Sequence, residues 1–273
     1  MLKLGHTIVR VDEAASTNSL VLASEPYLDQ HGLVVVARRQ SAGRGRLGRP
    51  WLDLSGEQLF ASIVVHPRLA AAETSIVSLI AGLAAAQAIR ETAGLDPRLK
   101  WPNDVLIRGR KVCGILVESS PSRNGAPRLV IGVGVNCQGN LEGLPPDLRG
   151  RVTALSQEAG RAIAPNSLLQ ALLTRLEALL ARLEAGGKTE LLIEWARNAD
   201  AAGRWVLFPS PGSGPAGSFR PGQDPSPASG QAPASPARTQ GIVQGITPEG
   251  YLVVEDLAGL RHVIVSSELV WRD

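Results

Sequence analysis

The chain has 273 residues, of which 44% are hydrophobic and 19% charged, so most of it is expected to fold around a core as one large and one small domain. Its formal net charge is only +3, which is weak support for a general nucleic-acid binder. Cys113 and Cys137 lack metal-ligand spacing, which argues against a zinc site or a disulfide framework and favours reduced core thiols in a cytoplasmic protein.

The first half of the chain contains four short β-rich runs bounded by turn residues, which predict strands. They cover residues 33–37, 59–66, 111–118 and 128–135. Between the second and third, an Ala-rich segment that begins at Thr74 and stops at Gly94 predicts a buried helix. Its apolar stretch is too short and too mixed to span a bilayer, so no membrane partner is expected. Residues 103–118 predict a β-hairpin that turns near Gly109.

Leucines at helical spacing run from Asn166 to the glycine pair Gly186 and Gly187, and they predict an amphipathic helix whose apolar face belongs to the core. A further helix is expected directly after it. Strands and helices do not alternate strictly, which favours an α+β fold over a doubly wound parallel sheet. We therefore expect residues 1–200 to form a mixed central β-sheet with helices on one face.

The character of the sequence changes after Gly203. Residues 209–238 contain nineteen Pro, Gly or Ser among thirty, too few apolar side chains to offset the entropy of ordering, so a disordered insertion is expected there. Short β-rich runs flank it and predict a small all-β barrel over residues 203–273. They cover residues 205–208, 241–246, 251–256 and 260–266.

The segment ARRQSAGRGRLGRPW, residues 37–51, contains five arginines and three glycines. Its glycines match G-x-G-x-x-G, but Pro50 and Gly56 argue against the helix that a dinucleotide-binding turn requires. No acidic residue lies about twenty positions downstream to bind a ribose. Glycines and arginines together suit a loop that closes over an anionic ligand, although a solvated basic turn has the same composition.

Four other stretches carry polar residues in suggestive places. Residues 16–18, Ser-Thr-Asn, could bind a polar head group or cap a helix. Asp104 could hold magnesium or simply complete an Asn-Asp turn. Lys111 begins an apolar strand, so its charge should lie at a sheet end or reach into a cavity. Asn136 ends a strand, at a pocket edge or in a plain turn.

These motifs, STN, QSAGRGRLGRPW, LKWPNDV, KVCGILVE and IGVGVN, resemble the biotin protein ligases in order and spacing over about residues 5–200. The resemblance implies a class II synthetase-like catalytic domain and an SH3-like C-terminal domain, with the Pro/Gly/Ser insertion as the largest departure. Larger members carry an N-terminal helix-turn-helix and act as repressors. Only fifteen residues precede Ser16, whereas a DNA-binding module needs on the order of 50, so we expect the ligase without specific DNA binding.

The family reaction implied by the resemblance has two steps. The carboxylate of biotin attacks the α-phosphorus of ATP to give biotinyl-5′-AMP and pyrophosphate, and a lysine of a carrier domain then takes the biotinyl group. Biotin, ATP and Mg²⁺ are the expected small molecules. The expected partner is the biotin carboxyl carrier protein of acetyl-CoA carboxylase. Binding of biotin before ATP, with ordering of the loop in between, follows as a hypothesis.

The resemblance also implies roles for single residues. Lys111 would lie between carboxylate and α-phosphate, Arg44 and Arg46 would belong to the loop that folds over the adenylate, and Asp104 would bind Mg²⁺ or orient a neighbouring group. Residues implied to contact biotin are Ser16, Thr17, Asn18 and Gln40. Residues implied to line the adenine and ribose side are Trp51, Asn103 and Asn136. Further ligand-binding positions in the same motifs are Gly43, Gly45, Arg49, Lys100, Trp101 and Gly114.

Two alternatives stay open at this point. A lipoate ligase shares the fold and the adenylate chemistry, although the GRGRLGRPW loop argues against it. A nucleic-acid-binding module could use the basic loop and the β-barrel, but aromatic residues do not interleave with those arginines. Related ligases can pair through an edge strand of the central sheet, so both a monomer and a homodimer are compatible with the sequence.

Overall fold

The computed structural model divides the chain into two compact units, Met1–Asp200 and Ala201–Asp273. The predicted insertion lies almost entirely outside the described residues, since only its ends, 209 and 238, fall within them. The residues that the structure describes are 3–54, 56–69, 74–121, 127–139, 141–199, 201–209, 238–265 and 269–271.

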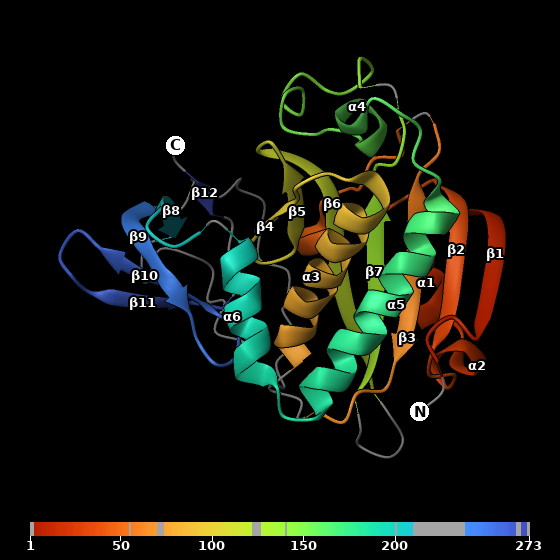
Figure 1. Ribbon diagram of the computed structural model, residues 1–273, viewed down its shortest axis with the longest axis horizontal. Coiled ribbons are helices and arrows are strands. Elements are labelled where there is room, and N and C mark those ends of the chain that lie inside the picture. The colour runs from red at the N-terminus through yellow and green to blue at the C-terminus, as the bar shows by residue number, and fades with distance from the viewer. Residues whose placement is uncertain are drawn as a thin grey trace, which may run out of the picture. The chain divides into compact units, whose positions relative to one another are not determined.

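The first unit is built on a seven-stranded mixed sheet with the order β1-β2-β3-β7-β6-β5-β4 (Figure 1). Its strands are β1 (Thr7–Ala14), β2 (Leu33–Gln40), β3 (Leu59–Val65), β4 (Arg98–Lys100), β5 (Asp104–Ile107), β6 (Arg110–Ser120) and β7 (Arg128–Val135). Only β1 and β2 pair in parallel, and the other neighbours are antiparallel. The sheet therefore confirms the predicted mixed α+β fold, while the edge strands β1 and β4 were not predicted.

Long helices cover one face of this sheet. The helices α3 (Thr74–Ala93) and α5 (Pro165–Glu184) pack side by side against the strands, and α6 (Lys188–Asn198) packs against both (Figure 1). The predicted helix layer on one face is confirmed. The short helices α1 (Thr17–Leu22) and α2 (Glu25–Leu28) lie on the opposite face, where Val21 of α1 belongs to an apolar cluster with side chains of β2, β3 and β7. That second face carries the polar residues of interest.

Helix α3 confirms the helix that was predicted to begin at Thr74 and stop at Gly94. By length and composition, Ser75–Ala93 could cross a membrane, so the expectation that this segment is too short was wrong. However, 72% of the relevant window is buried within the protein. Contacts with the sheet, α5 and α6 account for that burial, and they mark α3 as the central core helix of its unit.

The predicted hairpin is formed by β5 and β6 and turns at Arg108 and Gly109. Both residues have positive φ angles, 48° and 75°, as a two-residue type I′ turn requires. The strand pairing then slips, because Val105 pairs with Cys113 while Leu106 pairs with Lys111. This register shift is a β-bulge, and it turns the side chains that follow it toward a different face of the sheet.

The second unit is an antiparallel sheet with the order β11-β10-β9-β8-β12. Its strands are β8 (Trp205–Pro209), β9 (Arg238–Ile246), β10 (Leu252–Asp256), β11 (Arg261–Ile264) and β12 (Val270–Trp271). The four predicted β-rich runs coincide with the first four of these strands, whereas β12 was not predicted. Pro209 pairs with Arg238, so the segment between these residues connects neighbouring strands of one sheet. Closure into an SH3-like barrel stays a prediction.

Candidate functional site

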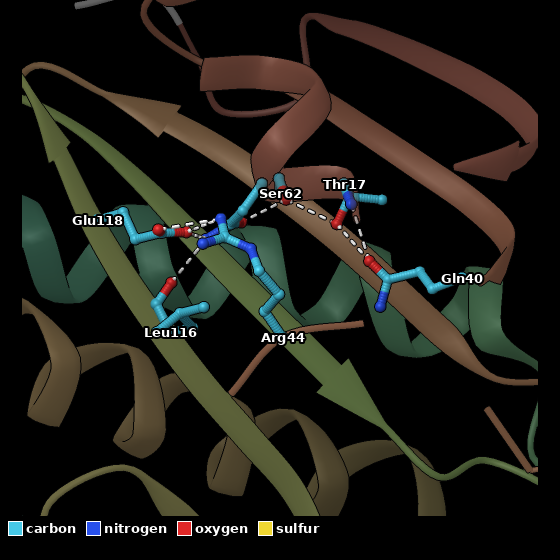
Figure 2. Close-up of polar contacts among 7 residues, drawn as sticks. Thr17, Gln40, Arg44, Ser62, Leu116 and Glu118 are labelled. Atoms are coloured by element: carbon cyan, nitrogen blue, oxygen red, sulfur yellow. Dashed lines mark hydrogen bonds and ion pairs between the residues drawn. The ribbon is translucent and has the colours of Figure 1, made fainter. Parts of the chain in front are cut away.

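Residues Ser16 to Asn18 begin helix α1 at a point where three strands bring polar side chains together. Strands β1 and β2 end beside each other, since the N–H of Ala42 donates to the carbonyl of Ala15 at 2.9 Å. The backbone N–H of Thr17 donates to Oε1 of Gln40 at 2.8 Å (Figure 2). Ser16 occupies the N-cap position but makes no side-chain cap bond, so capping does not explain its hydroxyl.

The buried hydroxyl of Ser62, on β3, connects Thr17 with Asn18. Ser62 Oγ lies 2.6 Å from Asn18 Oδ1 and 2.7 Å from Thr17 Oγ1. Ser62 has a single hydrogen for its two neighbours, and the Thr17 hydroxyl, which also lies 3.3 Å from Oε1 of Gln40, accepts at most that one hydrogen. Thr17 Oγ1 therefore keeps acceptor capacity for a ligand. Gln40 Nε2 makes no hydrogen bond to the described part of the chain, so its two hydrogens remain available.

The amide of Asn18 is fixed from both ends. Its Nδ2 donates to the carbonyl of Leu116 at 3.1 Å and to Oε2 of Glu118 at 2.8 Å. Gly132 makes room for it, because a Cβ at that position would lie 2.5 Å from Asn18 Oδ1. Both amide hydrogens are thus used within the protein, and Asn18 can offer a ligand only the free acceptor site on Oδ1.

The Gly/Arg loop, residues 43–51, forms a small hairpin, which is called the Gly/Arg hairpin below. The N–H of Trp51 donates to the carbonyl of Gly43 at 2.9 Å, and that of Gly45 donates to the carbonyl of Arg49 at 2.7 Å. A 3₁₀ turn, η1 (Arg46–Gly48), forms its tip, with a positive φ of 73° at its last glycine. The G-x-G-x-x-G glycines therefore serve a tight hairpin, and no helix follows them as a dinucleotide-binding turn would need.

Two arginines of this loop lie close to acidic side chains on the sheet. Arg44 Nη2 donates to both carboxylate oxygens of Glu118, at 3.0 and 2.9 Å (Figure 2). Burial lowers the pKa of Arg46 from its usual value, and nearby Asp104 opposes that shift. The guanidinium groups remain cationic at neutral pH, so the loop places positive charge on the open face of the sheet.

Trp51 lies on a floor made by two paired glycines, Gly114 of β6 and Gly134 of β7. A Cβ at these positions would lie 2.6 and 2.8 Å from atoms of the indole ring. Lys111 Nζ lies 5.1 Å from the ring centroid, a cation–π distance. Trp51 Nε1 is buried without a hydrogen-bond partner among the described residues. The indole and the end of the lysine side chain thus both lie against Gly114, since a Cβ there would also come within 3.2 Å of Lys111 Nζ, and the indole keeps an unused donor.

The side chain of Lys111 reaches the same face because of the bulge in β6. Strict alternation would place residues three apart, Lys111 and Gly114, on opposite faces, but the extra residue reverses this. Lys111 Nζ lies 2.7 Å from Asp104 Oδ1 and forms an ion pair with it. The structure therefore brings together Lys111, Asp104 and the Gly/Arg loop, whereas their roles toward a ligand stay predictions.

The described residues contain no group of three or more metal-ligating side chains. Asp104 is one carboxylate already paired with a lysine, and Mg²⁺ needs about six oxygen ligands. The residues present do not form a protein-only metal site, and any Mg²⁺ here would depend on ligand phosphates for most of its coordination. Direct binding by Asp104 stays a prediction.

Two other side chains that were predicted to line the ligand site form hydrogen bonds with backbone carbonyls of the protein. Asn103 Nδ2 donates to the carbonyl of Ile115 at 2.8 Å, and Asn136 Nδ2 to that of Thr153 at 3.0 Å. Both amides thus hold neighbouring segments in place, and their contacts with a ligand stay predictions. Trp101 is buried, with 3% of its surface exposed. Lys100, the residue before it, ends strand β4.

Ser62, Glu118 and Gly132 were missed as site residues. Ser62 is the one hydroxyl in the buried strand LFASIVV, and Glu118 is a carboxylate that follows the apolar run VCGILV. A lone polar residue in a buried strand was an available signal for each. The role of Gly132 depends on which side chain approaches it, and the sequence does not reveal that.

Known proteins resemble the chain in sequence. The model of the biotin/lipoate A/B protein ligase family matches residues 13–136. A biotin–[acetyl-CoA-carboxylase] ligase of Paracoccus denitrificans is 31% identical over 93% of this chain and 96% of its own length. The bifunctional ligase/repressor BirA of Bacillus subtilis is 31% identical over 70% of this chain, and the match spans only 59% of that relative.

Solved structures share the fold. The biotin protein ligase of Aquifex aeolicus in complex with biotin and ATP superposes with a TM-score of 0.74 at 24% identity, over 98% of this chain and 99% of that one. The biotin protein ligase of Leishmania major in complex with biotinyl-5-AMP gives a TM-score of 0.59 at 20% identity, over 96% and 99% of the two chains. At these identities the likeness concerns the fold alone.

Proposed function

Because the chain belongs to the biotin protein ligases within the biotin/lipoate A/B protein ligase family, we propose that it activates biotin with ATP and transfers it to a lysine of a biotin carboxyl carrier protein. The carrier of acetyl-CoA carboxylase is the proposed acceptor, as the name of the Paracoccus relative suggests. A cytoplasmic location is proposed with it, and the free, buried cysteines agree with a reducing compartment.

The hydrogen-bond pattern around Thr17 and Asn18 is the observation that carries this proposal. The two side chains have acceptor sites left, whereas Gln40 Nε2 has donors left. The ureido ring of biotin has two N–H donors and one carbonyl oxygen, which complement that pattern. The dithiolane ring of lipoate has no N–H group and would leave buried acceptors unpaired. Sites built to bond a polar group reject analogues without it, by about 10⁴-fold or more in known cases.

The cationic groups on the same face suit the first step. An oxygen of the biotin carboxylate would form a bond to the α-phosphorus of ATP while the bond to pyrophosphate breaks. Lys111, with Arg44 and Arg46, would offset the negative charge that the two reactants bring together. Trp51 would stack on adenine, and Asn103 and Asn136 would line the nucleotide side. Mg²⁺ would enter with ATP and neutralise its phosphates, as it does in other phosphate-transfer sites.

In the second step the carrier lysine would attack the carbonyl of the mixed anhydride, and AMP would leave. Water competes with that amine, so the Gly/Arg hairpin would have to cover the intermediate. The hairpin is suited to this because its arginines hold it through contacts with the sheet, as the Arg44 bond to Glu118 illustrates.

Pyrophosphate exchange tests the proposal and separates it from the alternatives. The protein is incubated with ATP, Mg²⁺ and labelled pyrophosphate, together with biotin, lipoate or neither, and label is measured in ATP. Exchange with biotin alone is expected. Exchange with lipoate would indicate a lipoate ligase. No exchange with either acid would overturn an acyl-adenylating function and would favour the nucleic-acid-binding alternative.

Binding order has its own test. Biotin is expected to bind first and to order the hairpin before ATP arrives. Isothermal titration calorimetry should therefore show tighter binding of a non-hydrolysable ATP analogue when biotin is present. Equal affinities with and without biotin would contradict this order.

A further inference from the structure

Glu118 lies where two parts of the site meet. Its Oε2 accepts from the amide of Asn18 at 2.8 Å. Both of its carboxylate oxygens accept from Nη2 of Arg44 (Figure 2). Asn18 belongs to helix α1 and Arg44 to the Gly/Arg hairpin, and 26 positions separate them in sequence (44 minus 18). A single carboxylate on β6 therefore contacts one residue proposed to bind the head group and one proposed to cover the intermediate.

We propose that Glu118 is a positioning residue, which orients the amide of Asn18 and the guanidinium of Arg44 together and thereby couples head-group binding to placement of the hairpin. This inference rests on the proposed function, since it deepens the account of the same site. Glu118 itself acts through its two partners and needs no contact with the substrate.

The contact with Asn18 decides which way its amide faces. With Leu116 and Glu118 accepting both amide hydrogens, Oδ1 must point toward Ser62 and the ligand side. Without the carboxylate, the amide loses one of the two acceptors that prevent it from turning over. A turned amide would present N–H groups to the N–H groups of a ureido ring, which would repel the head group.

The contact with Arg44 holds a side chain that would otherwise be mobile. The guanidinium group is bonded through Nη2 alone among the described residues, so Nε and Nη1 remain able to bind a ligand oxygen. Arg44 side-chain exposure is 44%, and an ion pair this exposed contributes little to folding. Its benefit lies in preorganisation, because an arginine fixed before binding loses less side-chain entropy when the ligand arrives.

Substitution of Glu118 should therefore affect ligand binding much more than stability. In Glu118→Gln, the new NH₂ group faces either Asn18 Nδ2 or Arg44 Nη2, both of which are donors. We expect the Kd for biotin, measured by calorimetry, to rise about 10- to 100-fold, as for loss of one to two charged hydrogen bonds. The urea midpoint should stay near that of the wild type. Glu91→Gln is the matched control, since Glu91 pairs with Arg175 on the helix layer.

A double-mutant cycle with Arg44→Ala tests whether the effect passes through the hairpin. If Glu118 acts partly through Arg44, Glu118→Gln should weaken biotin binding less in the Arg44→Ala background than in the wild type. Equal fold-changes in both backgrounds, or a Kd within twofold of the wild type for Glu118→Gln, would overturn the inference. Should Glu118→Gln fail to fold, Glu118→Asp replaces it, because the shorter carboxylate cannot reach both partners and should weaken biotin binding similarly. Failure of the wild type to bind biotin would instead overturn the proposed function.

Discussion

Gly132 is the position where one added methyl group should disturb the site most directly. In Gly132→Ala, the new Cβ would lie 2.5 Å from Oδ1 of Asn18 and 2.9 Å from its Cγ. Carbon and oxygen atoms do not approach this closely without bonding, and the neighbouring atoms belong to an amide held by three hydrogen bonds. Asn18 must therefore move or give up those bonds.

The magnitude follows from these contacts. Three hydrogen bonds contribute about 1 kcal/mol each to the free energy of unfolding, and overpacking in a well-packed region costs about 1–3 kcal/mol. Because the amide can keep some bonds by shifting, we expect a loss of about 2–5 kcal/mol. With a urea dependence of about 2.5 kcal/mol per molar, toward the upper end of the usual range for a chain of this size, the midpoint should fall by roughly 1–2 M. Binding of biotin should weaken by at least about 100-fold, since Oδ1 is displaced.

Urea unfolding followed by tryptophan fluorescence measures the first effect, and calorimetric titration with biotin measures the second. Gly82→Ala, inside helix α3, is the control. A Cβ at this position would lie at an ordinary 3.7 Å from Leu99, and the substitution should stabilise the helix by about 0.5–1 kcal/mol. Combining Asn18→Ala with Gly132→Ala should cost less than the sum of the single losses, since the clash disappears. A wild-type midpoint and affinity in Gly132→Ala would refute the placement of Asn18.

Three further predictions concern single side chains. Lys111→Ala should lower pyrophosphate exchange by about 10²-fold or more while the circular dichroism spectrum is retained, and substantial residual exchange would remove Lys111 from the chemistry. Burial, and to a smaller extent the charge of His66, lowers the pKa of His31 in the folded protein. The unfolded chain therefore binds this proton more tightly, and the free energy of unfolding should fall as pH drops below about 6.5. His31→Asn should flatten that dependence in urea titrations at pH 7.5 and 5.5, and an unchanged dependence would contradict the assignment. Burial raises the pKa of Cys137 to about 12 and raises that of Cys113 further, so a thiol reagent at pH 8 should label neither in the folded protein and both in denaturant.

The sequence by itself determined the elements whose signals are local. Hydrophobic periodicity located α5, the Arg108–Gly109 turn separated the two strands of the hairpin, and short β-rich runs located four of the five strands in the second unit. The edge strand β1 escaped prediction because its side chains are mostly exposed or half-buried, which leaves little apolar pattern to detect. Motif order likewise identified the family, since it depends on the sequence alone.

Tertiary structure decided how those motifs meet. Ser62 is 45 positions from Thr17, and Glu118 is 100 positions from Asn18 and 74 from Arg44, so only the pairing of β3, β7 and β6 makes them neighbours. The bulge in β6 decided the face that Lys111 occupies, against the period-two alternation of a regular strand. The sequence shows which residues are present and how far apart they lie along the chain, whereas strand register fixes which of them share a surface.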